Sequence, residues 1–104
     1  MPRIRVLEAA AEEAAEAAAR YEMQQPGLGT DFERAVDAAL DLLEEEFVPL
    51  VSMPGAAGKH GAKRLILKRF PYDVVVKERD GDLLVIAIAH HSRRPAYWRD
   101  RLST

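Results

Sequence analysis

Hydrophobic residues follow two different periods along this chain of 104 residues, and the change of period separates helices from strands. Ile4 and Val6 alternate with charged neighbours, which predicts a short strand over residues 2–7. From there on, apolar positions recur every three or four residues, as on one face of an amphipathic helix. The positions on this stripe are Leu7, Ala11, Ala14, Ala18 and Tyr21. Because the face is mostly alanine, a neighbouring element must approach it closely or a partner must cover it.

A second helix follows a break at residues 25–29, where Pro26 cannot continue a helix and the glycines permit positive φ. Thr30 followed by Glu33 fits a capping box that starts the new helix. Its apolar stripe consists of Phe32, Val36, Ala39, Leu40, Leu43 and Phe47. Two helices joined by so short a turn must lie antiparallel, so the pattern predicts a helical hairpin.

The second half of the chain has the patterns of a loop followed by strands. Residues 48–62 contain two prolines and three glycines, which indicates a loop. Three strands are expected beyond it, the first two separated by a Phe70-Pro71 turn and the last two by an Asp80-Gly81 hairpin turn. Their ranges are 64–69, 72–77 and 83–89.

The last of these strands is apolar without alternation, as expected of a strand covered on both faces. A short terminal helix is expected over residues 97–102. The order β-α-α-β-β-β predicts an α+β fold, in which a helical hairpin packs on a small, mostly antiparallel four-stranded sheet. A chain of this length forms one domain, residues 1–104.

Charge divides the chain unevenly, although the formal net charge is only −2. Residues 1–58 carry four arginines against twelve acidic residues, a net charge of −8. Residues 59–104 carry eleven lysines and arginines against five acidic residues, a net charge of +6. We therefore expect an acidic helical layer and a basic sheet face. A basic face of this kind suits an anionic partner, either a phosphate backbone or an acidic protein surface.

Several functional classes are excluded by composition. Without cysteine, the chain forms neither disulfides nor thiolate metal sites. The three histidines lack metal-ligand spacing, and no glycine-rich phosphate motif is present, so we expect no metal and no nucleotide cofactor. No apolar run approaches the roughly 20 residues that span a bilayer, and the N-terminus is too short and polar for a secretory signal. The expected location is the cytoplasm, with no membrane partner.

Three groups of residues, in this order and spacing, carry a family resemblance over nearly the whole chain. They are Tyr21-Glu22 with Pro26-Gly27-Leu28-Gly29 and Phe32, then Arg69-Phe70-Pro71-Tyr72, then Ala89-His90 with Arg93, Pro95, Tyr97 and Trp98. Together they resemble the RelE/ParE superfamily of toxins from bacterial type II toxin–antitoxin systems, which includes proteins described as plasmid stabilisation proteins. The resemblance implies a growth-inhibiting toxin that is neutralised by a cognate antitoxin in a hetero-oligomer. It further implies that an amphipathic C-terminal segment of the antitoxin wraps around the toxin.

The superfamily divides by target. Its ParE-like members are gyrase inhibitors that act by binding, whereas its RelE-like members are ribosome-dependent endonucleases that cleave mRNA. We favour the ParE-like branch, because the position that matches a typical arginine of the ribonuclease branch is Asp73, whose carboxylate repels phosphate. The candidate target-binding residues are Lys68, Arg69, Arg93, Arg94, Arg99 and Arg101. Of these, Arg94, Arg99 and Arg101 have few evident partners within the chain.

The alternative is a metal-independent ribonuclease on the same fold. RNA cleavage through the 2′-hydroxyl needs a group that takes a proton, a group that returns one, and cations that hold the phosphate. His91, Arg93 and Tyr97 are the candidates for these catalytic roles, since histidine titrates near neutral pH. A third reading is a degenerate family member that retains only antitoxin binding.

The candidate antitoxin-binding residues are Ala11, Ala14, Ala18 and Tyr21, since small side chains on a helix leave shallow grooves for larger apolar side chains of a partner. Other residues near the chain end have structural readings. We expect His90 to be a histidine of the structural framework, held by hydrogen bonds. We expect Trp98 to be a core residue. Arg93 is a candidate for an ion pair with Asp73.

Overall fold

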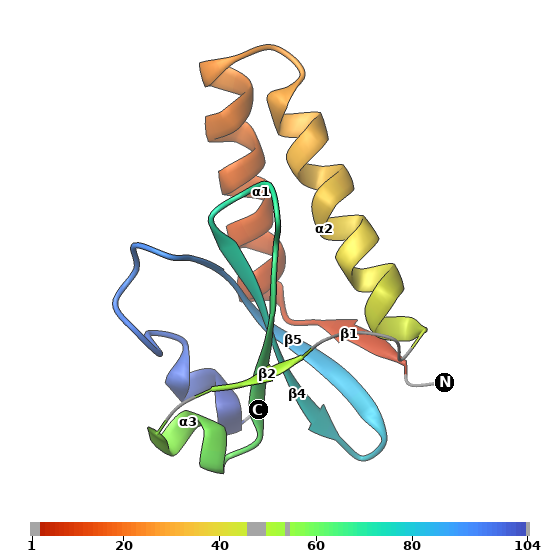
Figure 1. Ribbon diagram of the computed structural model, residues 1–104, viewed down its shortest axis with the longest axis vertical. Helices are drawn as coiled ribbons and strands as arrows, with labels where there is room; N and C mark the ends of the chain where they lie inside the picture. The colour runs from red at the N-terminus through yellow and green to blue at the C-terminus, as the bar shows by residue number, and fades with distance from the viewer. Residues whose placement is uncertain (1–2, 46–49, 54, 104) are drawn as a thin grey trace.

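The sheet order is β1-β5-β4-β3-β2, five strands within the described residues, which are 3–45, 50–53 and 55–103 of this computed structural model (Figure 1). The strands are β1 (Ile4–Val6), β2 (Val51–Ser52), β3 (Ala62–Ile66), β4 (Tyr72–Arg79) and β5 (Asp82–His90). β1 runs parallel to β5, and all other neighbours are antiparallel. The α+β fold with a mostly antiparallel sheet is confirmed, but the expected number of four strands is wrong by one.

The additional strand lies inside the segment that the sequence indicated as a loop. Val51 and Ser52 pair with Arg64 and Lys63 of β3, and the short helix α3 (Gly55–Lys59) follows. β3 itself ends at Ile66, so the expected strand over residues 64–69 is displaced toward the N-terminus. Part of the expected loop, residues 48, 49 and 54, lies outside the described residues, as does Phe47.

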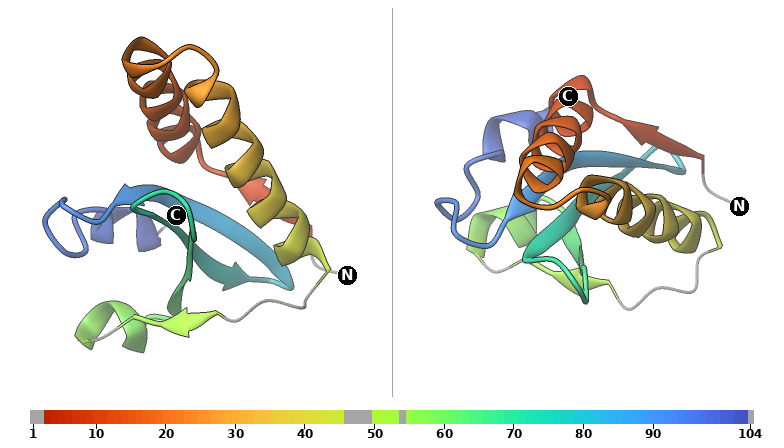
Figure 2. Two further views of the ribbon diagram at one scale, coloured as in Figure 1. Left: turned by 45° about the horizontal axis from the view of Figure 1, so that its top comes forward. Right: turned by 90° about the horizontal axis from the view of Figure 1, so that it is seen from above.

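Helices α1 (Glu8–Gln24) and α2 (Leu28–Glu44) form the predicted antiparallel hairpin on one side of the sheet. The 3₁₀ helix η1 (Arg99–Ser103) lies on the other side, and Figure 2 shows the sheet between the two. η1 begins two residues later than the terminal helix expected from the sequence. The central strands β4 and β5 are therefore covered on both faces over most of their length.

The hairpin is fixed at its tip by a contact that the sequence did not predict. α2 starts at Leu28 rather than after Thr30, so the proposed capping box is wrong. Instead, the Glu22 carboxylate accepts hydrogen bonds from the backbone N–H groups of Gly27 and Gly29, at 2.9 and 3.0 Å. A Cβ atom on Gly29 would lie 2.4 Å from the carbonyl oxygen of Ala18. Only glycine permits the two helices to approach this closely.

Two hydrophobic clusters follow from the alternation of side chains along the strands. The cluster between the helices and the sheet includes Phe32, Leu43 and Val74, and the cluster on the opposite face includes Ile86 and Trp98. Leu83–Ala89 contributes to both, which confirms that this strand is covered on two sides. Trp98 is only 3% exposed, so its reading as a core residue is also confirmed.

The segment between β3 and β4 is anchored by aromatic side chains. Phe70 and Tyr72 are buried and pack against Phe32 and Tyr21, with ring centroids 5.0 to 5.2 Å apart for three of the pairs. The neighbouring Lys68 is exposed. The aromatic residues thus anchor this turn, while the Lys68 side chain is exposed to solvent.

A basic cleft and a helical groove as candidate functional sites

A cleft of about 480 Å³ opens on the sheet face opposite the helical hairpin. Alternation along the strands explains its lining, because Arg64 and Asp73 point to this face while Leu65 and Val74 enter the helix-side core. The turn after β5 supplies the rest. We call this the basic cleft, and its ionisable lining residues are Arg64, Asp73, His90, His91, Arg93, Arg94 and Tyr97.

The charge of Asp73 is offset within the basic cleft. Asp73 is only 7% exposed, and its carboxylate lies 2.8 Å from Nε2 of His91 and 3.4 Å from Nη1 of Arg64. These two partners lessen the repulsion between Asp73 and phosphate that the sequence led us to expect. The expected pair between Asp73 and Arg93 is not formed. The Arg93 guanidinium instead stacks on the Tyr97 ring, 3.9 Å from its centroid.

Tyr97 and Arg101 are held by Glu13, a residue of α1 that the sequence did not single out. The Tyr97 hydroxyl donates a hydrogen bond to the Glu13 carboxylate. Nη1 of Arg101 lies 2.8 Å from the same carboxylate and 3.0 Å from the carbonyl oxygen of Ile86. The expectation that Arg101 has few partners within the chain is therefore wrong.

The short length of β1 explains why this cluster forms. β1 pairs only with Leu83–Val85, so the next part of the β5 edge lacks a neighbouring strand. Glu13 accepts a hydrogen bond from the backbone N–H of Ile88 at 3.2 Å, and Arg101 binds the carbonyl of Ile86. Buried backbone groups need such partners, and here side chains provide them.

Burial raises the pKa of Tyr97 well above its usual value, and the hydrogen bond to Glu13 and the negative charge of Glu13 raise it further. Tyr97 therefore keeps its proton throughout the physiological pH range. The Tyr97 hydroxyl already donates a hydrogen bond to Glu13, and this contact positions the turn that follows β5.

The six target-binding candidates do not form one surface. Arg93 and Arg94 line the basic cleft, where the sequence placed them beside His91 and Tyr97. Arg69 pairs with Asp31 of α2 at 3.1 Å, on the helix side. Arg94 and Arg99 are exposed, and no carboxylate in the described part of the chain pairs with either.

His90 has the structural role expected of it. Its Nδ1 accepts hydrogen bonds from the backbone N–H and the hydroxyl of Ser92, at 2.9 and 2.7 Å. Its ring also packs edge-on against Tyr72, with centroids 4.9 Å apart. These contacts fix the path of the chain as it leaves β5.

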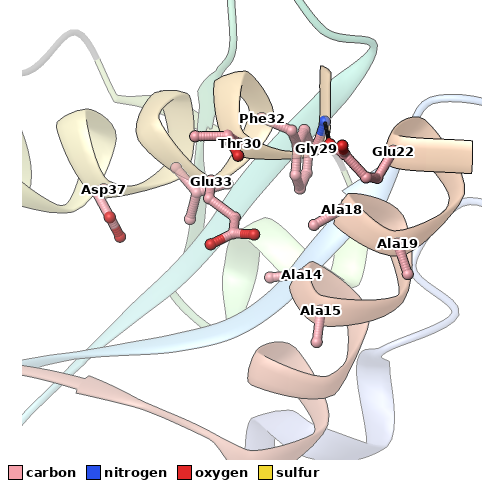
Figure 3. A pocket seen from close by; sticks show the side chains of 11 residues that line it. Ala14, Ala15, Ala18, Ala19, Glu22, Gly29, Thr30, Phe32, Glu33 and Asp37 are labelled. Carbon is pink, nitrogen blue, oxygen red and sulfur yellow. Dashed lines mark hydrogen bonds between the residues drawn. The ribbon is translucent and has the colours of Figure 1, made fainter. Parts of the chain in front are cut away.

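A groove of about 550 Å³ runs between α1 and α2 (Figure 3). Four alanines of α1 line one wall, and Figure 3 shows Ala14 and Ala18 facing the space that Glu33 of α2 enters. We call this the helical groove. The acidic residues that line it are Glu22, Glu33 and Asp37, and it has no basic lining residue within the described part of the chain.

The helical groove contains only part of the proposed antitoxin-binding set. Ala14 and Ala18 line it, whereas Ala11 is exposed outside it and Tyr21 packs in the aromatic cluster. Ala15 and Ala19 line the groove as well, although their positions are off the apolar stripe of the sequence.

Neither a metal centre nor a membrane span is found among the described residues. No three of their histidine, aspartate and glutamate side chains are grouped so as to hold a metal ion. None of the helices over these residues is long and apolar enough to cross a bilayer.

Comparison with known proteins identifies a solved structure with a similar fold. No protein-family model matches the sequence, and no curated protein matches it either. Among solved structures, the chain is similar to one described as "Chromosomal ParDE TA system from P. aeruginosa", with a TM-score of 0.72 and 13% sequence identity. The match covers 86% of this chain and 96% of the other. The chain therefore has the ParE-like fold that the resemblance implied.

Proposed function

We propose that this protein is the toxin of a type II toxin–antitoxin system, that it acts in the bacterial cytoplasm by binding DNA gyrase, and that a cognate antitoxin neutralises it. The ParE-like fold supports the general class of the proposal. The observation that carries the mode of action is the basic cleft, where Arg93 and Arg94 are exposed and form no ion pair within the described residues. Exposed guanidinium groups of this kind bind anionic surfaces of large partners.

The state of Tyr97 favours binding over catalysis. A general acid or base in RNA cleavage needs a pKa near the working pH and a proton it can exchange. The Tyr97 hydroxyl is bound to Glu13 and its pKa is raised, so it meets neither requirement. Its ring instead supports the Arg93 guanidinium.

One observation supports the alternative, an mRNA endonuclease on the same fold. Asp73 lies 2.8 Å from Nε2 of His91, a contact that orients the imidazole and makes Nδ1 the acceptor in the neutral ring. An imidazole oriented in this way can take a proton from a 2′-hydroxyl, and Arg93 and Arg94 lie in the same cleft to hold a phosphate.

Induction of variants in bacteria separates the two functions. A toxin that acts by binding loses toxicity on joint Arg93→Gln and Arg94→Gln substitution but keeps it on His91→Ala substitution. DNA breaks with an SOS response then precede any mRNA cleavage, and the purified protein inhibits supercoiling by gyrase. Joint substitution of the exposed Arg34 and Arg79 by glutamine removes the same charge elsewhere and serves as the control.

Loss of toxicity in His91→Ala, with mRNA cleavage as the first event, would assign the ribonuclease function instead. Wild-type protein that is harmless on induction, yet still captured by an antitoxin, would indicate the degenerate family member. Each result therefore selects one of the three readings.

Within this proposal, the helical groove is the docking site for an antitoxin helix. Its alanine wall accepts large apolar side chains, and its acidic residues Glu22, Glu33 and Asp37 suit a helix that also carries basic residues. Ala18 is only 6% exposed, so a large residue there disturbs folding as well as binding. Ala15 is exposed and lines the groove, which makes it the better position for a test.

The Ala15→Arg variant should remain folded and toxic but escape neutralisation by the antitoxin. Ala38→Arg introduces the same side chain at an exposed position of α2 outside the groove, and should be neutralised normally. Co-expression of toxin and antitoxin, followed by colony counts, measures both. Normal neutralisation of Ala15→Arg would show that the antitoxin binds elsewhere.

A further inference from the structure

A second cleft, of about 420 Å³, lies between α1 and the turn after β5. It is on the helix side of the sheet, since Tyr72, one of its lining residues, belongs to the helix-side core, while the adjacent Asp73 faces the basic cleft. We call it the α1 cleft. Its lining residues are Ala17, Arg20, Tyr21, Gln24, Tyr72, His90, Ser92 and Arg93, and none of them carries a carboxylate.

Arg20 is the first cation of the α1 cleft. Its Nη2 donates a hydrogen bond to the Tyr72 hydroxyl oxygen at 3.1 Å. Because that oxygen accepts, the hydroxyl proton of Tyr72 is free to be donated to a ligand. Within the described residues Arg20 forms no ion pair, although most charged residues of α1 are acidic.

His90 adds a further donor. Its Nδ1 accepts two hydrogen bonds from Ser92, which places the proton of the neutral ring on Nε2. No hydrogen-bond partner for that Nε2–H is found in the described part of the chain. Arg93 is the second cationic residue that lines the α1 cleft, and its guanidinium stacks on Tyr97, a residue of the basic cleft.

We propose that the α1 cleft binds a phosphate group, held between Arg20 and Arg93. Two guanidinium groups offer the forked donors that phosphate oxygens accept best, and the neighbouring hydroxyl and imidazole donors extend the same pattern. Because no carboxylate lines the α1 cleft, the positive charges of Arg20 and Arg93 are not neutralised there. The contrast with the helical groove, whose charged lining residues are all acidic, makes the α1 cleft the anion site on the helix side.

The size of the α1 cleft allows two sources of the phosphate. A volume of about 420 Å³ lies within the range of pockets for small molecules, so the group belongs to a free phosphate ion or to a mononucleotide. This inference does not depend on the proposed target. Phosphate binding is measured on the isolated protein, whereas toxicity depends on the target and the antitoxin.

The test is a titration with inorganic phosphate, and separately with adenosine monophosphate, at constant ionic strength. Isothermal calorimetry gives the affinity, and NMR locates the site. We expect saturable binding and chemical-shift changes at Ser92 and at the His90 ring, with the exposed His60 ring unchanged. Tighter binding of the nucleotide than of phosphate would identify a nucleotide ligand, and equal affinities would identify the free ion.

Arg20→Gln should weaken binding by about tenfold to a hundredfold, as expected for the loss of one charge-assisted contact. Arg34→Gln, at an exposed arginine of α2 outside the cleft, should have no effect. If Arg20→Gln disturbs folding through its bond to Tyr72, the same comparison is made with the exposed Arg93→Gln. The proposal is wrong if no saturable binding occurs up to about 10 mM, a range that reaches weak millimolar affinity. It is also wrong if these variants bind as tightly as the wild type.

Discussion

Glu13 is the residue whose replacement should reveal most about how the C-terminal segment is held. Its carboxylate accepts hydrogen bonds from the Tyr97 hydroxyl, the Arg101 guanidinium and the backbone N–H of Ile88. Glu13→Gln keeps the shape of the side chain but removes its charge and one acceptor oxygen. In the variant, one amide oxygen is left to accept hydrogen bonds from three donors, and the amide NH₂ group is itself a donor.

The expected loss follows from the burial of the cluster. Breaking a buried ion pair by removing one partner costs about 3–5 kcal/mol, and an unsatisfied buried donor costs about 1–3 kcal/mol. The side chains of Glu13 and Arg101 are 15% and 26% exposed, so water screens the pair and compensates part of the loss. We therefore expect the free energy of unfolding to fall by about 2–4 kcal/mol, a large part of the stability of a small domain.

Urea unfolding at pH 7 measures this change, with Trp98 as the probe, because it is the only tryptophan and is buried. Glu12→Gln, at the adjacent exposed position, should change the stability by less than about 0.5 kcal/mol. A double-mutant cycle with Arg101→Gln should give a coupling energy between the two sites of about 1 kcal/mol or more. A loss below about 1 kcal/mol for Glu13→Gln, without coupling to Arg101, would refute the role of this cluster.

Two further predictions concern the hairpin and the alkaline limit of stability. Gly29→Ala should lower the free energy of unfolding by about 1–3 kcal/mol, since its Cβ would lie 2.4 Å from the Ala18 carbonyl oxygen. Thermal denaturation measures the loss, with Thr30→Ala as the control. A loss no larger than that of Thr30→Ala would contradict the prediction. The folded-state pKa of Tyr97 lies above its ordinary value of 10, so its stabilisation is complete below that pH and is lost as the pH rises further. In urea unfolding between pH 8 and 11, Tyr97→Phe should show a weaker loss of stability above pH 10 than the wild type; equal slopes would contradict it.

Periodic patterns in the sequence were sufficient for the main elements of the fold. The stripe from Phe32 to Leu43 predicted α2, and the uninterrupted apolar run after the Asp80-Gly81 turn predicted a strand covered on both faces. β2 was missed because two residues, Val51 and Ser52, are too short to show any period. The start of α2 was misplaced because its cap comes from Glu22 of the preceding helix and not from a local capping box.

The candidate site was predictable where its residues are neighbours in sequence. His91, Arg93 and Tyr97 follow one strand, so their approach to one another could be anticipated. The partner shared by Tyr97 and Arg101 could not, since Glu13 lies 84 and 88 positions away from them and meets them only through the fold. Without that contact, Arg101 resembles a free surface arginine, which is how the sequence interpretation went wrong.

The early end of β1 has a consequence for self-association. Beyond Val85, the outer side of β5 is not open to another strand, because Glu13 and Arg101 occupy the backbone groups of Ile88 and Ile86. Unpaired strand edges are templates on which further copies of a chain can add and aggregate. The ion pair that tethers the C-terminus thus also closes this border of the sheet, so that ordered polymerisation cannot begin there.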